Sequence, residues 1–390
     1  MIRMRHPAKR IAAMTADGIL AALAPLLTRG SAAGVIPPSP RVLLIRCDHI
    51  GDAAMATAVI RPLHDALAPS RLDVLAAPWA AHVFASHPLV DHVVPVTTPW
   101  WSAARGARWP QRLAHWAELP RTIRHLRAER YDIGIDLRGD LRHITFFLAL
   151  AGIPVRVSSD RTGGRRLLTH VASFDASRHE VEKNMAVVSL LGATGHPQLE
   201  IPASTDMPAW IRAALDPHGR GTGFVALALR GAAPKRSWPA AHAAALADRL
   251  HDELGLASVY VGGLHEAAFA QSIADQSRAG VVNLAGRTTL AESIEVLRAA
   301  EATVAVDSGP MHLAAAVGSP VVALFGSSDP RLFRPWATIA RIVASSERCH
   351  CQGERCALVQ GEAHCMRQIM PASVFDAVRD VVSISATKRL

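Results

Sequence analysis

Residues 303–330 read TVAVDSGPMHLAAAVGSPVVALFGSSDP, which predicts a strand, a polar turn, a small-residue helix and a second strand. The apolar run 303–306 is typical of a buried parallel strand. Asp-Ser-Gly-Pro at 307–310 predicts a helix start, because proline is favoured early in a helix. The alanine-rich segment 313–317 lets this helix lie close to a sheet, and 321–325 predicts the next strand. The stretch therefore predicts one β-α-β unit of a parallel sheet.

The start of this helix is a candidate anion site. Unpaired backbone N–H groups and the positive end of the helix dipole favour a phosphate there. His312 in the first turn adds a donor, and we expect Asp307 to orient amides rather than touch an anion. Every doubly wound protein contains such turns, so the geometry alone does not identify a ligand.

The same alternation of strand and helix runs through most of the chain. The first half has apolar runs at 41–46, 72–76, 93–96 and 133–137, and the second half has them at 225–229, 258–261, 281–284, 303–306 and 321–325. This rhythm predicts an α/β fold with parallel sheets, in which the loops after the strands share one edge. It pauses at the proline-containing stretch 200–217. We therefore expect an extension and linker (1–40), a first Rossmann-like domain (41–205) and a second (206–390).

The composition of the chain narrows the classes of molecule that it is expected to bind. The 390 residues carry 42 Lys and Arg against 33 Asp and Glu, a net charge of +9, which favours phosphates, acidic glycolipids or nucleic acid without choosing among them. No apolar stretch is long enough to predict a spanning helix. Basic residues precede the mostly apolar 11–27, so a signal peptide, an amphipathic helix on the inner leaflet and a helix packed on the protein all stay open.

Several motifs resemble glycosyltransferase family 9, the heptosyltransferases. DSGPMHLAAA (307–316) resembles the donor-site signature of that family, RCDHIGD (46–52) its opening signature, and ALRGAAPKRSWP (228–239) its diphosphate loop. The motifs come in the family's order over about residues 41–370. The resemblance implies a GT-B fold, in which two Rossmann-like domains face each other across a cleft. It also implies an inverting transfer of heptose from ADP-heptose to a lipopolysaccharide core.

Asp52 is the candidate catalytic residue. An aspartate before a helix often only caps it, and the residue pattern alone allows that interpretation. The resemblance implies a general base that takes a proton from the acceptor hydroxyl. We expect the start of a helix over 53–67 to keep the pKa of Asp52 low, so that it is always ionised. Gly51 allows the backbone to approach the acceptor closely.

The resemblance places the donor in the second domain. Lys235 is implied to hold the diphosphate, with Arg236 sharing the task, because neutralising the leaving group favours the reaction. A solvated basic loop is the alternative. Glu266 is implied to bind the ribose. Thr288 is implied to line the base pocket, although the pair that it forms with the next threonine also suits a helix cap. The full donor set is Lys235, Arg236, Glu266, Thr288, Asp307, Ser308, Gly309 and His312.

The acceptor side has weaker signals. Tryptophans and arginines interleave over 100–130, which suits nucleic acid, a membrane interface or an acidic glycolipid. A surface helix with core tryptophans and solvated arginines is equally compatible. The following stretch resembles the family's strand and turn into the cleft. The resemblance therefore implies acceptor binding by Arg138, Asp140 and Arg142, together with Gly51.

A cysteine cluster lies near the C-terminus. Cys349, Cys351, Cys356 and Cys365 have the spacing of a metal site, although Cys-x-Cys is not the common zinc-ribbon pair. A structural zinc or iron, reduced thiols and disulfides stay open. A subgroup of the resembled family that glycosylates autotransporter proteins carries a metal in this region. The resemblance implies that catalysis itself requires no cofactor.

The resulting prediction is a cytoplasmic transferase with ADP-heptose as donor and an acidic glycolipid as acceptor. Peripheral contact with the inner membrane is a further hypothesis, and no nucleic-acid partner is expected. Three alternatives stay open: another nucleotide sugar or a protein acceptor within the same family, a non-catalytic nucleotide-binding scaffold, and a nucleic-acid binder whose affinity falls steeply with salt.

Overall fold

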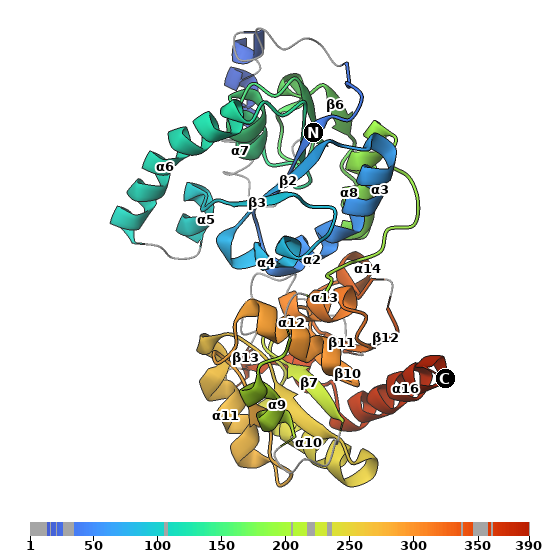
Figure 1. Cartoon of the computed structure of the whole chain (residues 1–390). Coiled ribbons are helices and arrows are strands. Elements are labelled where there is room, and N and C mark those ends of the chain that lie inside the picture. The colour runs from blue at the N-terminus through green and yellow to red at the C-terminus, as the bar shows by residue number, and fades with distance from the viewer. Residues whose placement is uncertain are drawn as a thin grey trace. The chain divides into compact units, whose positions relative to one another are not determined.

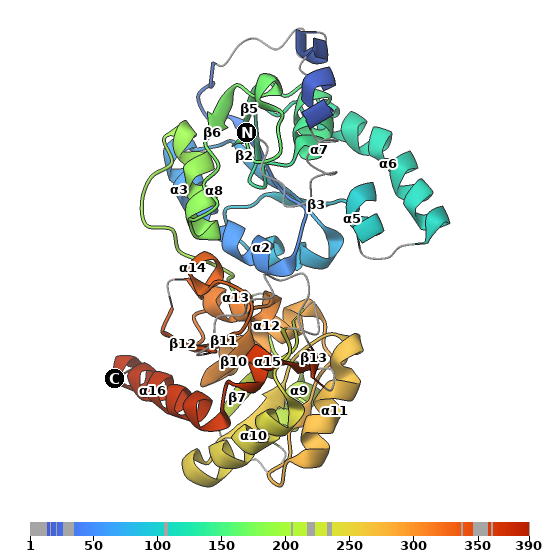
Figure 2. The ribbon, with the colours of Figure 1, turned by 180° about the vertical axis from the view of Figure 1, so that it is seen from behind.

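The computed structural model describes residues 14–15, 17–20, 22–25, 35–104, 108–203, 206–216, 223–231, 236–336, 338–345, 358–359 and 362–389. The chain divides into two compact units, residues 1–198 and 199–390. Each unit is a parallel sheet covered by helices on both faces (Figures 1 and 2). The expected division after residue 205 lies seven residues beyond the observed one.

The first unit is built on six parallel strands. They are β1 (Arg41–Arg46), β2 (Arg71–Ala76), β3 (His92–Pro95), β4 (Ile133–Asp136), β5 (Val155–Ser159) and β6 (His170–Ala172), in the order β3-β2-β1-β4-β5-β6. The central strand β1 is buried on both faces, which explains its continuous apolar run. Ile45 pairs with Asp136, so the loops after β1 and β4 lie side by side at one edge of the sheet.

Helices connect these strands. They are α2 (Ile50–Ala56), α3 (Ile60–Leu67), α4 (His82–Ala85), α5 (Pro99–Ala104), α6 (Trp109–Ala128), α7 (Leu141–His143) and α8 (Glu180–Val188), with a π-helical turn at Ile144–Ala149. The helix predicted over 53–67 begins three residues earlier and is divided by a 3₁₀ turn at Thr57–Val59. Pro62 lacks the N–H group that a continuous helix would need, which accounts for the division. Asp52 consequently lies in the first turn of α2.

The second unit repeats the same strand order. Its strands are β7 (Phe224–Ala228), β8 (Ala257–Tyr260), β9 (Val282–Asn283), β10 (Ala302–Val306), β11 (Val321–Phe325) and β12 (Ala340–Ala344), arranged β12-β11-β10-β7-β8-β9. A short hairpin joins β13 (Leu358–Val359) to β14 (Glu362–Ala363). All nine strands predicted from the sequence are present in the two sheets to within a residue or two.

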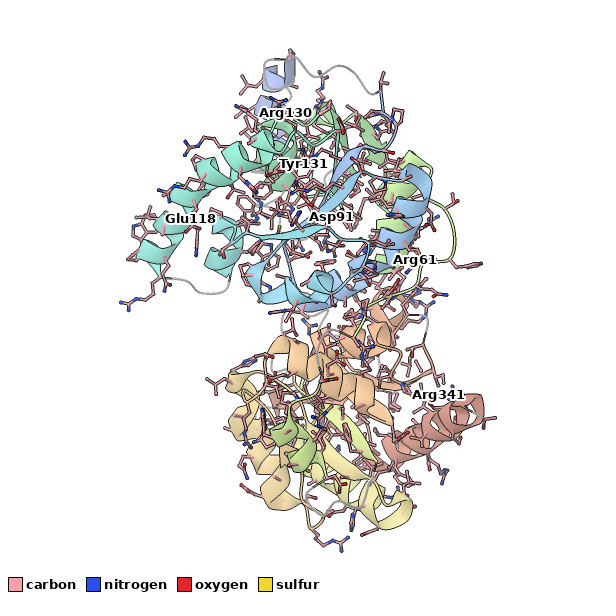
Figure 3. The ribbon with its side chains drawn as sticks, viewed as in Figure 1. Arg61, Asp91, Glu118, Arg130, Tyr131 and Arg341 are labelled. Atoms are coloured by element: carbon pink, nitrogen blue, oxygen red, sulfur yellow. The ribbon has the colours of Figure 1, made fainter. Side chains whose placement is uncertain are left out.

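Eight helices of the second unit lie within the described residues. They are α9 (Ala209–Leu215), α10 (Ala240–Leu254), α11 (Ala267–Gln276), α12 (Leu290–Ala299), α13 (Gly309–Ala316), α14 (Pro330–Phe333), α15 (His364–Arg367) and α16 (Pro371–Arg389). The opening stretch is confirmed as β10, α13 and β11, with Pro310 in the first turn of α13 and the alanines buried against the sheet. Arg341 of β12 donates to Asp380 of α16 at 2.8 Å, which ties that helix to the edge strand (Figure 3).

Within the described ranges, no helix is both long and apolar enough to span a bilayer.

Candidate active site

A buried guanidinium, that of Arg46, lies at the carboxyl end of β1 and joins three carboxylates. Its Nε lies 3.0 Å from Oδ1 of Asp48. Its Nη2 lies 3.1 Å from Oδ1 of Asp52 and 3.0 Å from Oε1 of Glu180. Its Nη1 donates to Oδ1 of Asn184 at 3.2 Å. Burial lowers the pKa of Arg46, but the three carboxylates outweigh burial and raise it above the usual value, so the side chain stays charged.

Asp52 is the most accessible of these carboxylates. Its side chain is 18% exposed, against 0% for Asp48 and 8% for Glu180. Burial raises the pKa of Asp52 to about 7, with Asp48 and Glu180 adding to the rise while Arg46 opposes it. The predicted low pKa is therefore wrong: desolvation and two like charges exceed the favourable effect of the helix start. A carboxyl group with this pKa gains and loses its proton near neutral pH, as a general base should.

Arg138, in the loop after β4, contacts the Arg46 cluster. It forms an ion pair with Asp48, the neighbour of Asp52 in the Arg46 cluster. Its guanidinium lies 5.0 Å from the ring of Trp101, which in turn contacts the edge of His49 at 4.8 Å. The structure thus gathers three predicted site residues, Gly51, Asp52 and Arg138, at one edge of the first sheet.

Asp140 and Arg142 have a different environment. Asp140 is buried and begins α7, accepting from the backbone N–H of Arg142 at 3.0 Å and from its guanidinium at 2.8 and 2.6 Å. Arg142 leaves 48% of its side chain exposed and lies 5.0 Å over the ring of Trp100. Both oxygens of Asp140 are thus engaged within α7, whereas Arg142 retains an accessible face. Acceptor binding by these residues stays a prediction.

A pocket of about 340 Å³ opens beside Arg138 within the first unit. Arg161 lies 5.2 Å over the ring of Phe174, and the ammonium of Lys183 lies 5.5 Å from the same ring. Lys183 also contacts Oε2 of Glu180 at 3.4 Å. Burial, with a contribution from Arg138, lowers the pKa of Arg161, whereas Glu180 opposes the shift. No sequence pattern pointed to Glu180, Arg161 or Lys183, because β5, β6 and α8 were not predicted.

In the second unit, Arg236 joins the loops after the neighbouring strands β7 and β10. Its Nη1 donates to the backbone oxygen of Asp307 at 3.2 Å and to the Oδ2 atom of Asp307 at 3.3 Å. Lys235 lies outside the described residues. Trp238 is fully buried and donates to the backbone oxygen of Ile369 at 2.9 Å, so the predicted Trp-Pro pair anchors this loop.

At the start of α13, the side chain of the preceding serine does not cap the backbone amides. Ser308 has the N-cap position, but its hydroxyl donates back to the carbonyl of Val306 at 3.0 Å. Gly309 begins the helix, and His312 is buried in its first turns. Asp307, just before this helix start, forms an ion pair with Arg236. The arrangement fits the predicted anion site at a helix start.

Glu266 and Thr288 lie on two loops that touch. Glu266 accepts from the hydroxyl of Tyr260 at 2.9 Å and from the N–H of Gly263 at 3.2 Å. Gly286, with φ +71°, donates its N–H to the Gly262 carbonyl at 2.9 Å. A Cβ on Gly286 would lie 2.5 Å from the backbone of the Glu266 loop, so a side chain would separate the two loops.

The Thr pair divides its roles. Thr289 and Glu292 form a capping box at the start of α12, so the helix-cap interpretation holds for Thr289. Thr288 instead shares a hydrogen bond of 2.7 Å with the Ser293 hydroxyl.

Most of the cysteine cluster cannot be described. Cys349, Cys351 and Cys356 lie outside the described residues, and Cys365 is buried on α15. Among the residues that the structure describes, no group of three His, Cys, Asp or Glu could hold a metal. The metal prediction therefore stays untested.

A family model for glycosyltransferase family 9 (heptosyltransferase) matches residues 119–360, more than half of the chain. The chain belongs to glycosyltransferase family 9. This confirms the resemblance and shows that the protein is a transferase enzyme. Lipopolysaccharide heptosyltransferase 2 of Escherichia coli K12 is 28% identical over 321 residues, covering 78% of this chain and 87% of that protein.

Two solved structures confirm the fold. The family 9 glycosyltransferase of Veillonella parvula DSM 2008 has a TM-score of 0.75 at 21% identity, covering 90% of this chain and 99% of that one. E. coli ADP-heptose lipopolysaccharide heptosyltransferase II has a TM-score of 0.70 at 23% identity, covering 89% and 99%. The two Rossmann-like units are therefore those of a GT-B glycosyltransferase.

A third structure shares the fold. The iron-containing dodecameric glycosyltransferase TibC of enterotoxigenic E. coli H10407 has a TM-score of 0.53 at 13% identity, covering 90% of this chain and 78% of that one. A protein of the same fold thus contains iron.

Proposed function

We propose that this enzyme transfers heptose from ADP-heptose to a lipopolysaccharide core, with inversion at the anomeric carbon and Asp52 as general base. The observation that carries the proposal is the position of Asp52, an accessible carboxylate held by Arg46 at the carboxyl edge of the first sheet. The lipopolysaccharide heptosyltransferase relative supports the choice of sugar and acceptor.

The proposed reaction is a single displacement. The acceptor oxygen forms a bond to the anomeric carbon as the bond from that carbon to the diphosphate oxygen breaks. The ADP leaves with the electron pair, and the hydroxyl proton passes to Asp52. Because the attack comes from the face opposite the leaving group, the configuration inverts. A pKa of about 7 leaves Asp52 ionised in much of the protein at neutral pH and basic enough to accept this proton.

The donor-binding residues lie in the second unit. Arg236 and the start of α13, with Asp307, Ser308, Gly309 and His312, favour the diphosphate, and Lys235 joins them by resemblance. Cations and helix amides neutralise the charge that develops on the departing ADP, so we propose that the transfer step needs no cofactor.

Glu266 and Thr288 bind the nucleoside in this proposal. The Glu266 carboxylate has about four acceptor sites and uses two of them on Tyr260 and Gly263, so it can still accept from ribose hydroxyls. Thr288 lies just beyond Gly286, on the loop that contacts the Glu266 loop.

The pocket beside Arg138 supports an acidic acceptor. Arg161 rests on Phe174 rather than against a carboxylate among the described residues. Lys183 and Arg138 add positive charge to the same pocket. A carboxylate or phosphate of the glycolipid could pair with these cations, which makes an acidic sugar the preferred acceptor over a neutral one.

Contact with the cytoplasmic leaflet of the inner membrane also belongs to the proposal. Trp109, Leu113 and Trp116 recur every three or four residues on α6 and are 65%, 50% and 49% exposed. The helix contains four arginines and one acidic residue, Glu118 (Figure 3). Exposed tryptophan beside arginine suits the interface of an anionic bilayer. The basic residues of 1–13, which prompted the same hypothesis, lie outside the described residues.

We retain a structural zinc or iron on Cys349, Cys351, Cys356 and Cys365 as a proposal, supported by cysteine spacing alone. Elemental analysis of the purified chain tests it: about one metal per chain supports it, and a metal-free folded chain rejects it.

Product analysis tests the proposed function. The protein is incubated with ADP-heptose and a core-truncated lipopolysaccharide, and the product is examined by mass spectrometry and NMR. A single added heptose with inverted anomeric configuration is expected. Retained configuration would reject the mechanism, and transfer only from another nucleotide sugar or only to a protein would reject the proposed substrates.

A further inference from the structure

We propose that Glu180 and Asn184, on α8, are positioning residues for the base Asp52 and act through their shared partner Arg46. The proposal rests on the proposed role of Asp52. It goes beyond that role because these residues belong to none of the motifs by which the site was recognised.

The first argument is geometric. Glu180 and Asn184 are four residues apart on α8, so they face the same way. Both are buried, and they hold two different nitrogens of Arg46, at 3.0 Å and 3.2 Å. The amide of Asn184 also lies 3.5 Å from the backbone oxygen of Met55, on the helix that carries Asp52. Helix α8 therefore contacts both the guanidinium and the helix of the base.

The start of α8 is itself fixed. Nδ1 of His179 accepts from the N–H of Val181 at 3.2 Å, and Glu182 accepts from the N–H of His179 at 2.9 Å. This reciprocal capping places Glu180 as the first residue of the helix, where a carboxylate is favoured by the helix dipole. The position of the Glu180 carboxylate is thus set by the cap and by Arg46 together.

The second argument is electrostatic. Glu180 and Asp52 compete for the same Nη2 atom of Arg46. Burial raises the pKa of Glu180, but Arg46 and Lys183 lower it to about 2, so Glu180 stays ionised and keeps its share of the guanidinium. Asp52 receives less of that stabilisation and becomes the group that titrates near neutral pH.

Other charges around Asp52 come from four elements. Asp48 follows β1, Arg138 follows β4, Arg161 follows β5, and Lys183 lies on α8. Removing the charge of Glu180 leaves these groups in place and lets Arg46 pair more fully with Asp52. The acid limb of the rate profile should then move to lower pH, and turnover at high pH should fall because the base becomes weaker.

The test compares Glu180→Gln with Glu182→Gln. Both changes remove one negative charge from the same turn of α8, but Glu182 faces the helix cap and its amide oxygen can still accept from His179. We expect Glu180→Gln to move the acid limb of kcat/KM down by about one pH unit, with the KM for ADP-heptose unchanged. Glu182→Gln should keep the wild-type profile. Coincident profiles for the two variants and wild type would overturn the proposal.

A second variant guards against misfolding of the first. Asn184→Ala removes one contact to Arg46 and one to α2 without changing charge, and we expect kcat to fall about tenfold at constant KM. Unchanged kcat would contradict the proposal.

The Asp52→Asn variant separates the positioning role from the base assignment. If it abolishes turnover while the Glu180 and Asn184 variants behave as wild type, only the positioning role fails. If Asp52→Asn remains active, the base assignment fails.

Discussion

Asp52 and Glu180 meet at a single nitrogen: Nη2 of Arg46 lies 3.1 Å from the first carboxylate and 3.0 Å from the second. The two carboxyl groups nevertheless titrate far apart, with pKa values of about 7 and about 2. Burial raises both pKa values, but Arg46 and Lys183 outweigh it at Glu180, whereas the charge of Asp48 adds to it at Asp52. Of these two carboxyl groups, Asp52 is therefore the one that changes charge near neutral pH.

The first prediction concerns pH. Transfer requires the ionised form of Asp52, so kcat/KM should be constant well above pH 7 and fall about tenfold for each pH unit below it. A base with the usual aspartate pKa near 4 would show no such loss down to about pH 5. Initial rates from pH 5 to 9 with saturating acceptor distinguish the two, and a flat profile would exclude Asp52 as the titrating base.

A second prediction concerns the donor. Arg236→Ala removes the guanidinium bound to Asp307 and one cation of the proposed diphosphate site, so the Kd for ADP should rise about tenfold, equivalent to ~1.4 kcal/mol. Calorimetric titration measures it. Arg249→Ala on α10, whose guanidinium donates to Glu253 of the same helix at 2.7 Å, is the matched control and should bind ADP as wild type does. Equal affinities for both variants would remove Arg236 from the donor site.

The third prediction concerns the acceptor. Arg161→Ala and Lys183→Ala remove the two cations that flank Phe174, so each should raise the KM for an acidic acceptor about tenfold and leave the KM for ADP-heptose unchanged. Arg165→Ala, whose side chain is 71% exposed, is the control. The pocket assignment fails if the acceptor KM stays constant, or if a dephosphorylated acceptor responds to the changes as strongly as the charged one.

A fourth prediction concerns the membrane. Trp109→Ala with Trp116→Ala should reduce cosedimentation with vesicles of anionic phospholipid at least severalfold, because exposed tryptophan contributes at bilayer interfaces. Trp210→Ala on α9, 41% exposed, is the control and should sediment as wild type does. Equal sedimentation of both variants would refute the assignment. If the wild type binds short RNA and the double variant Trp109→Ala, Trp116→Ala does not, the result would instead favour the nucleic-acid alternative.

In the two six-stranded sheets, the sequence predicted the strands that are continuously apolar and missed three others for identifiable reasons. Strand β5 contains Arg156, which is buried because it donates to the backbone oxygens of Leu167 and Ile153. Strand β6 has three residues, and β12 is a partly exposed edge strand. Their apolar pattern is therefore short or interrupted, although they complete both sheets.

The site shows the same limit. Asp52 and Arg138 stand in recognisable motifs, but Glu180 lies 134 residues from Arg46, and no local pattern connects a glutamate on one helix to an arginine on a distant strand. The pKa of Asp52 was mispredicted for a related reason, since the burial that raises it most and the nearby Glu180 carboxylate are both supplied by the fold. The motif pointed to Asp52 as the candidate base, and the tertiary structure sets the acidity of its carboxyl group.

The most direct measurement is transfer by Asp52→Asn, with ADP affinity determined on the same preparation. The change removes the proton acceptor and keeps the size of the side chain. We predict that heptose transfer falls at least a hundredfold, in line with the usual contribution of a general base, while the Kd for ADP stays at the wild-type value. Transfer at the wild-type rate, with ADP binding intact, would contradict the account and leave Asp52 as a structural partner of Arg46 in the first turn of α2.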